Sequence, residues 1–166
     1  MSRGLGDVYK RQVSGKGIEA ASMSALVKTA LTAYAWEGAG PARMARSLNS
    51  MLMGFSRVET FVTAFIAKID LKAGRATYCS AGHPPTMVIR PESMPLGGGE
   101  PRGGEVELLG CQSGVIGAFE SMVYETGVFT FAPGDMLFMY TDGTIEARDR
   151  TGAVSYTHLT LPTNRE

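Results

Sequence analysis

Cysteine and long apolar runs are both scarce in this chain. Only Cys79 and Cys111 occur among the 166 residues, and neither belongs to a CxxC pair or a similar metal-ligand spacing. No stretch approaches the roughly 18 uninterrupted apolar residues of a membrane-spanning helix, and the start lacks the apolar segment of a signal peptide. These absences argue against a cysteine-ligated metal site and against membrane contact by this segment. We therefore expect a protein of the reducing cytoplasm.

An excess of charge of either sign is also missing. Sixteen basic residues balance sixteen acidic ones, so no net field recruits nucleic acid or an anionic membrane. The chain has neither a GxxxxGK[ST] motif nor a GxGxxG motif that follows a strand, which gives a nucleotide-binding module little support. Its length fits one domain with a substantial core, and no internal repeat or long linker divides it.

The two ends of the chain differ from its middle. Residues 1–12 (MSRGLGDVYKRQ) and 155–166 (SYTHLTLPTNRE) are polar and lack sustained periodicity. They resemble translated sequencing-adapter sequence, so we expect a non-native head and tail around a partial domain at residues 13–154. The alternative is an ordinary pair of frayed termini. Either way, the functional residues should lie between Val13 and Val154.

Two helices are predicted before any strand. Apolar residues recur at helical spacing over residues 18–36, with few charges between them, which predicts a helix buried on most sides. Gly38 and Gly40 end it. Pro41 fits the first turn of a second helix, whose apolar face consists of Met44, Leu48, Met51 and Leu52.

The rest of the middle predicts a mostly antiparallel sheet. Turns are expected at residues 72–74, which would close a hairpin, and at Pro133-Gly134. Residues 91–104 are rich in Gly and Pro and should form a surface loop, which could also serve as a lid or a docking site. The predicted strands are residues 61–70, 75–80, 87–90, 106–109, 122–131 and 135–141.

Two motifs suggest chemistry on phosphate. The apolar run Met136-Leu137-Phe138-Met139 reads as a buried strand that ends on Tyr140-Thr141-Asp142-Gly143, which would deliver a carboxylate to a sheet edge, where hard cations are bound. Far upstream, the Gly15, Lys16 and Gly17 turn enters the first helix, and helix N-termini favour anions. The plainer alternatives are a turn-capping Asp142 and a solvated Lys16 in a packing turn.

Four motifs in order carry a family resemblance. Residues 13–18 (VSGKGI), 61–63 (FVT), 81–85 (AGHPP) and 140–143 (YTDG) resemble those of bacterial SpoIIE-type phosphatases, which belong to the metal-dependent protein phosphatases related to type 2C. The resemblance implies an α+β fold, a four-layer αββα sandwich of mostly antiparallel sheets flanked by helices, here a partial domain. It also implies two Mn²⁺ or Mg²⁺ ions and removal of phosphate from serine or threonine of a regulatory partner protein, such as an anti-sigma-factor antagonist.

The resemblance also assigns residues, incompletely. It implies that Asp142 binds metal through its carboxylate and Val13 through its backbone carbonyl, with an activated water as the nucleophile and no catalytic side chain. The family's aspartate before Val13 is replaced by Gln12, a neutral amide. Asp7 imitates that aspartate five residues too early. Two further family aspartates are expected outside residues 13–154, so we predict impaired activity for this chain.

Supporting roles remain open. Gly15, Lys16 and Gly17 are candidates for contact with the phosphate of the substrate. His83 and Gly143 are candidates for supporting the residues that bind metal. His83 could act as a general acid, or it could be a hydrogen-bonded residue that fixes the strand exit. A non-catalytic interaction domain with the same fold is the main alternative function, and Gln12 favours it if that residue is native. An exposed edge strand could also pair two copies into a homodimer.

Overall fold

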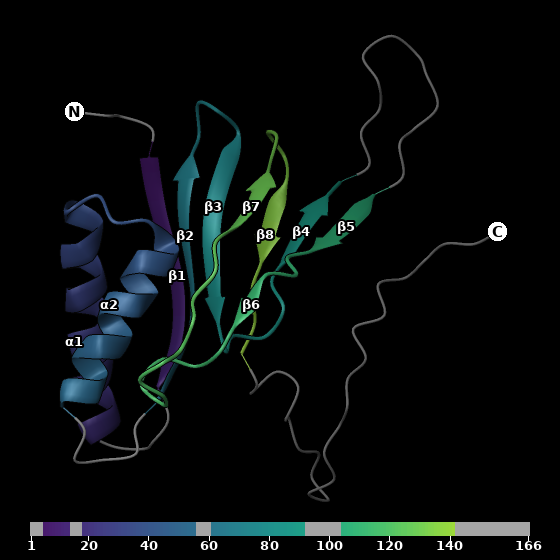
Figure 1. Ribbon diagram of the computed structural model, residues 1–166. Helices are drawn as coiled ribbons and strands as arrows, with labels where there is room; N and C mark the ends of the chain where they lie inside the picture. Colours follow the sequence, from purple (N-terminus) through teal and green to yellow (C-terminus); the bar gives the residue numbers. More distant parts are fainter. Residues whose placement is uncertain (1–4, 14–17, 56–60, 92–103, 142–166) are drawn as a thin grey trace, which may run out of the picture.

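The described part of the molecule consists of one helical layer and two sheets (Figure 1). The computed structural model describes residues 5–13, 18–55, 61–91 and 104–141, and within β1 and the first turn of α1 it describes the backbone only. The elements in chain order are β1 (Leu5–Val13), α1 (Ile18–Trp36), α2 (Pro41–Gly54), β2 (Val62–Asp70), β3 (Arg75–Ala81), β4 (Met87–Arg90), β5 (Glu105–Leu108), β6 (Gln112–Ser113), β7 (Gly127–Thr130) and β8 (Met136–Phe138).

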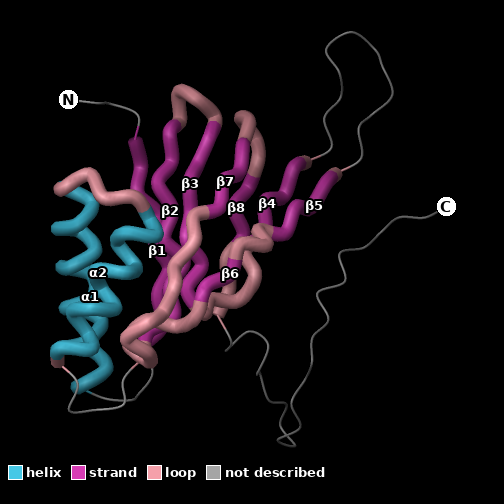
Figure 2. Tube along the Cα trace, in the orientation of Figure 1, coloured by secondary structure: helices cyan, strands magenta, loops and turns pink. Residues whose placement is uncertain are grey.

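The strands form a five-stranded and a three-stranded sheet. The larger sheet has the order β1-β2-β3-β6, with β7 also paired to β3, and the smaller has the order β5-β4-β8. Every pair of neighbouring strands is antiparallel except β3 and β6. Both helices lie on one side of the larger sheet, where α1 contacts β1 and α2 contacts β2 and β3 (Figure 2). The α+β class and the mostly antiparallel sheets are confirmed.

Two apolar cores fill the spaces between the three layers. The first lies between the helices and the larger sheet, and the second lies between the two sheets. Alternate residues of β2 and β3 serve the two cores, since successive side chains of a strand point to opposite faces. The largest members of the first core are Leu31, Leu48, Ile66, Ile116 and Tyr124, and those of the second are Phe65, Tyr78, Val88, Leu109 and Phe129.

Local chemistry explains the second helix and the first hairpin. Pro41 occupies the first turn of α2, where its missing N–H costs nothing, and Met44, Leu48 and Leu52 form the buried stripe at i, i+4 spacing. Between β2 and β3, the carboxylate of Asp70 accepts hydrogen bonds of 3.0 Å from the backbone N–H groups of both Lys72 and Ala73. The predicted hairpin is therefore confirmed.

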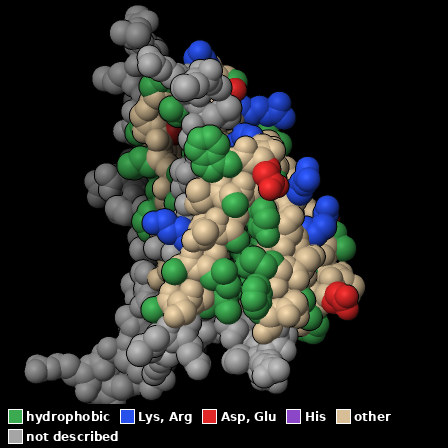
Figure 3. Space-filling view, turned by 90° about the vertical axis from the view of Figure 1, so that its left-hand side faces the viewer, with side chains coloured by type: hydrophobic (Ala, Val, Ile, Leu, Met, Phe, Trp, Pro, Cys, Tyr) green, Lys and Arg blue, Asp and Glu red, His purple; other side chains and the backbone are tan. Residues whose placement is uncertain are grey.

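The prediction for the first helix is wrong in one respect. Among its described side chains, only Val27, Ala30 and Leu31 are buried, which is one stripe and not most of the surface. Ala33 is exposed, and Trp36 is 88% exposed. The helical side of the molecule accordingly carries hydrophobic side chains between its charged ones (Figure 3). Alanine repeats at helical spacing indicated a helix correctly but did not indicate how many of its faces would be covered.

Two strand predictions also need correction, and strand β1 was not predicted. The predicted strand 122–131 is limited to β7, because residues 122–126 form an irregular segment that packs Met122 against the first core. The predicted strand 135–141 is limited to β8, which is not buried on both faces: Met136 is 55% exposed and Phe138 38%. Finally, Leu5–Val13 forms strand β1, although the residues of this segment show no sustained periodicity. Whether residues 1–12 and 155–166 are foreign stays a prediction.

The outer face of the smaller sheet is apolar. The strand register places six apolar residues on it, and no helix of the described ranges lies there. The second helical layer of the predicted four-layer sandwich would lie on this face, and it stays a prediction. The six residues are Met87, Ile89, Val106, Leu108, Met136 and Phe138. In the part of the chain that the structure describes, no helix combines the length and the apolar character needed to cross a membrane.

Candidate functional site

Strand register within each sheet and the short connection between the sheets indicate that β1 and β8 end at the same end of the sandwich. Val13, the last residue of β1, pairs with Val62, the first residue of β2. Two residues further along β2, Ala64 forms a bridge with Gly82, which directly follows β3. The end of β1 and the exit of β3 therefore lie on either side of the start of β2.

The chain then leads from β3 to β8. Residues 82–86 connect β3 to β4, and Met87 at the start of β4 pairs with Phe138 at the end of β8. Tyr140 and Thr141 follow two residues later and are the last described residues before Asp142. Both β1 and β8 run toward the lower end of the view in Figure 1. The described neighbours of the two phosphate-related motifs thus lie at one end of the sandwich.

Gly82 is required where it stands. Its φ of +63° lies in the left-handed region, which side chains with a Cβ adopt rarely, and a Cβ there would collide with the side chain of Val115. The N–H of Gly82 donates to the carbonyl of Ser113 at 2.8 Å. The AGHPP motif is therefore a tight exit from β3, closed by the segment that follows β6.

His83 is buried in this exit, with 4% of its surface exposed. Its Nδ1 lies 2.8 Å from the carbonyl oxygen of Pro84, and because a carbonyl can only accept, Nδ1 carries the proton and donates. The imidazole also lies beside the ring of Phe65, with 6.1 Å between ring centroids. This geometry supports the strand-exit role, whereas the general-acid role stays a prediction.

A buried polar network at the same end was not predicted. Asn49 of α2 is 3% exposed; its amide donates to the carbonyl of Phe119 at 3.0 Å and its oxygen accepts from the N–H of Gly117 at 2.7 Å. The hydroxyl of Tyr124 lies 3.1 Å from both that oxygen and the carbonyl of Val115. The available signal was an asparagine between apolar residues of a helix, where an unpartnered amide would be costly.

This network holds the irregular segment against the start of β2. Ile116 and Val62 exchange two backbone hydrogen bonds of 2.8 Å, and Val62 is the partner of Val13 in the sheet. Burial raises the pKa of Tyr124 to about 12 and that of the nearby Cys79 thiol to about 11, so both stay neutral at pH 7. The surroundings of Val13 on the β2 side are therefore fixed by uncharged, hydrogen-bonded groups.

Most predicted ligands lie outside the described residues. That holds for Gly15, Lys16, Gly17, Asp142 and Gly143. Val13 is described through its backbone, at the end of β1.

Gln12, which replaces the family aspartate, and Asp7, which lies five residues earlier, are both in β1. Gln12 pairs with Thr63, whereas Asp7 pairs with Lys68 and lies six residues before Val13, or about 20 Å along the strand. Asp7 therefore cannot substitute for the missing aspartate beside Val13.

The oxygen atoms predicted to bind metal are of the kind that hard cations prefer, but they carry little negative charge. No group of three or more His, Cys, Asp or Glu residues suited to a metal occurs among the described residues. The sequence offers the Val13 carbonyl and the Asp142 carboxylate, both oxygen donors of the kind that Mg²⁺ and Mn²⁺ prefer. Gln12 contributes no charge. One carboxylate and neutral oxygens fit such an ion but retain it weakly.

Comparison with known proteins identifies the family. Residues 8–163 match the family model described as stage II sporulation protein E (SpoIIE), which is most of the chain. The chain belongs to the SpoIIE family. The family membership expected from the four motifs is thereby confirmed, and the match begins within β1.

Individual relatives agree with this assignment. The SpoIIE-family chain is 26% identical over 140 residues to the phosphoserine phosphatase RsbU of Bacillus subtilis, covering 84% of this chain and 39% of that protein. A crystal structure of RsbU and RsbW domains from Mycobacterium tuberculosis superposes with a TM-score of 0.70 at 24% identity, covering 89% of this chain and 38% of that one. A structure of RsbX in complex with magnesium superposes with a TM-score of 0.65 at 22% identity, covering 90% of this chain and 65% of that one. The chain therefore spans well under half of the curated relative.

Proposed function

We propose that this chain is part of a metal-dependent protein serine/threonine phosphatase. The proposal is supported by the ends of β1 and β8, which lie at the same end of the sandwich. The pairings of Val13 with Val62 and of Met87 with Phe138, and the short connection from β3 to β4, indicate this arrangement. The similarity to the phosphoserine phosphatase RsbU supports the same chemistry.

Two oxygen donors of this chain would hold the metal. They are the backbone carbonyl of Val13 and the carboxylate of Asp142, and Gly143 is proposed to support Asp142. Bound Mn²⁺ or Mg²⁺, two ions in an intact domain, supplies charge that lowers the pKa of water and offsets the charge of the phosphoryl oxygens. The magnesium complex of RsbX supports a divalent cation of this kind.

Other residues of the chain would act on the substrate and the scaffold. Lys16 and the amides of Gly15 and Gly17 precede the first residue of α1, where a phosphate monoester is favoured by the helix dipole and by the positive side chain. His83 holds the β3 exit in place through its bond to Pro84. A metal-activated water would serve as the nucleophile, so no side chain of this chain is assigned that role.

Gln12 limits this activity. A neutral amide stands where the family places a ligand aspartate, so we propose that the chain as written binds metal weakly and turns over slowly. The same residue favours the second candidate, a non-catalytic domain of the same fold that binds a regulatory partner. The two candidates differ in one property, which is turnover once the carboxylate is restored.

The proposed substrate is a phosphorylated regulatory protein of the cytoplasm. The family resemblance favours an anti-sigma-factor antagonist that carries phosphoserine or phosphothreonine, and the similarity to the phosphoserine phosphatase RsbU supports phosphoserine. Pairing of edge strands from two copies is a further proposal for its assembly.

The test is hydrolysis of a phosphoserine peptide in the presence of Mn²⁺. We expect Gln12→Asp to raise the rate and Asp142→Ala to abolish it, whereas Glu37→Ala, at an exposed position just after α1, should leave the rate unchanged. The longer reading frame around residues 13–154 should also encode aspartates on both sides. Full activity in the Asp142→Ala variant would rule out the metal role, and no turnover after Gln12→Asp in the longer protein would favour the binding domain.

A further inference from the structure

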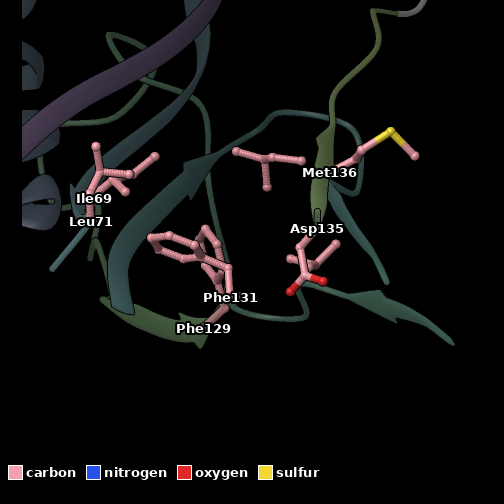
Figure 4. Close-up of a pocket in the computed structure, with 8 residues that line it drawn as sticks. Ile69, Leu71, Phe129, Phe131, Asp135 and Met136 are labelled. Carbon is pink, nitrogen blue, oxygen red and sulfur yellow. The ribbon is translucent and has the colours of Figure 1, made fainter. Parts of the chain in front are cut away.

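A pocket opens between the two sheets at the end opposite the proposed phosphatase site. Residues Ile69 and Leu71 of the β2–β3 end line one side, and Asp135 and Met136 at the start of β8 line the other, with Phe129 and Phe131 between them (Figure 4). Since β2 runs from Val62 to Asp70, the pocket lies about 25 Å from the Val13 end.

The floor of this pocket is apolar and its rim is exposed. Val88 and Phe129 of the second core form part of the floor, and they are 1% and 5% exposed. At the rim, Leu71 is 65% exposed. The side chain of Met136 points away from Phe129 and Phe131, toward the outer face of the smaller sheet (Figure 4). The volume of 160 Å³ is close to that of cavities that hold one benzene ring, so it accommodates one side chain of leucine or phenylalanine size.

A wider depression of 620 Å³ adjoins the pocket and shares Leu71, Phe131 and Asp135 with it. Its remaining lining comes from the two turns, residues 72–74 and 132–134, most of which are exposed. The hydrogen bond of 2.9 Å from the N–H of Phe131 to the carbonyl of Gly74 holds the two turns together. Because sites for small molecules enclose about 70–90% of their ligand, a surface this open suits a chain segment that lies across it.

The charge on one side of the pocket favours a basic partner. Arg90 lies within 4 Å of three carboxylates: Glu107 at 2.6 Å, Asp135 at 3.8 Å and Glu105 at 3.9 Å. One cation facing three anions leaves an excess of two negative charges. Glu105 is 71% exposed at its side chain and can meet a partner, whereas Asp135 is only 10% exposed and is fixed by a bond of 2.9 Å from the N–H of Ala132.

We propose that this pocket and the adjoining depression bind an extended peptide segment of a partner protein. An apolar side chain of leucine or phenylalanine size fills the pocket, and a neighbouring lysine or arginine faces the carboxylates around Arg90. Lys72 on the opposite rim orients the segment, since it repels the basic residue from that side. The inference does not depend on phosphatase activity, because none of these residues lies at the proposed metal end.

The test is a titration of methyl-labelled full-length chain with the capped peptide acetyl-Gly-Leu-Lys-Gly-amide, followed by NMR. We expect chemical-shift changes at the methyl groups of Ile69, Leu71, Val88 and Leu137. Replacing the peptide leucine by alanine should weaken binding by about tenfold or more, the cost of losing one buried leucine. Replacing the lysine by glutamate should also weaken it, and that difference should shrink in about 1 M salt.

Two protein variants and one control complete the experiment. Leu71→Ala should weaken binding, whereas Leu108→Ala should not, because Leu108 is similarly exposed at 63% but lies on the outer face of the smaller sheet. Asp135→Asn keeps an oxygen for the N–H of Ala132 and should reduce the preference for lysine over glutamate. If Asp135→Asn does not fold, the comparison of Leu71→Ala with Leu108→Ala still tests whether the pocket binds the peptide.

Four results would overturn the proposal. They are absence of shifts up to about 10 mM peptide, equal binding of the leucine and alanine peptides, equal loss in Leu71→Ala and Leu108→Ala, and pocket shifts that depend on protein concentration without peptide. The last result would identify a second copy of this chain as the occupant.

Discussion

Replacing Asn49 by alanine should destabilise the molecule far more than replacing its exposed neighbour Ser50 on the same helix. The substitution removes the acceptor of the Gly117 N–H and the donor to the Phe119 carbonyl, and it takes one of two acceptors from the Tyr124 hydroxyl. Phe119 is 63% exposed, so water can reach its residue, whereas Gly117 is half-buried. One to two buried polar groups left without partners cost about 2–4 kcal/mol in total.

The size of the effect can be checked by urea denaturation. Tyr124→Phe should cost only about 1 kcal/mol, because Asn49 keeps its other two hydrogen bonds. Ser50→Ala, an exposed substitution one residue further along α2, should stay within about 0.5 kcal/mol. In a double-mutant cycle, Asn49→Ala and Tyr124→Phe should not be additive, since they share one hydrogen bond.

Hydrogen exchange gives an independent measurement of the same network. The amide of Gly117 should lose protection in Asn49→Ala, and the amides of Ile116 and Val62 should follow if the segment detaches from β2. The reasoning would be refuted if Asn49→Ala matched Ser50→Ala in stability, or if exchange at Gly117 did not change. Either result would mean that the irregular segment is held by apolar packing alone.

Two further predictions concern the β3 exit and the buried thiol. Gly82→Ala should cost more than about 1 kcal/mol, because of its positive φ and the collision with Val115, whereas Gly110→Ala, where a Cβ meets nothing within 4 Å, should be nearly neutral; thermal unfolding distinguishes them. The folded state holds the Cys79 proton to about pH 11, while an unfolded thiol loses it near 9.0. The free energy of unfolding should therefore fall between those pH values by about 1.4 kcal/mol per pH unit, and Cys79→Ala should remove this part of the slope in urea titrations at each pH. An unchanged slope in that variant would contradict the assignment.

Much of the fold could be predicted from sequence because periodicity and turn chemistry are local. The helices over 18–36 and from Pro41, the β2–β3 hairpin and strand β4 follow from residues close in the chain. Burial depends on what covers a face, and for α1 and β8 the described partners cover only one side. Segment 122–126 was predicted as a strand because Met122, Val123 and Tyr124 are typical strand residues, yet Tyr124 turns its hydroxyl to Asn49 instead of joining a ladder.

Strand β1 was missed for a related reason. Its residues alternate poorly, and its pairing with β2 along all nine positions comes from backbone hydrogen bonds, which sequence patterns do not report.

The register between β1 and β2 also matters for the proposed site. A shift of one residue between β1 and β2 would turn each side chain of β1 to the opposite face and move the Val13 carbonyl along the edge. The nine pairings between β1 and β2 restrain that shift, and the pairing of Ile116 with Val62 holds the start of β2 in place. The position of the Val13 carbonyl at this end is therefore set by ordinary sheet and loop contacts.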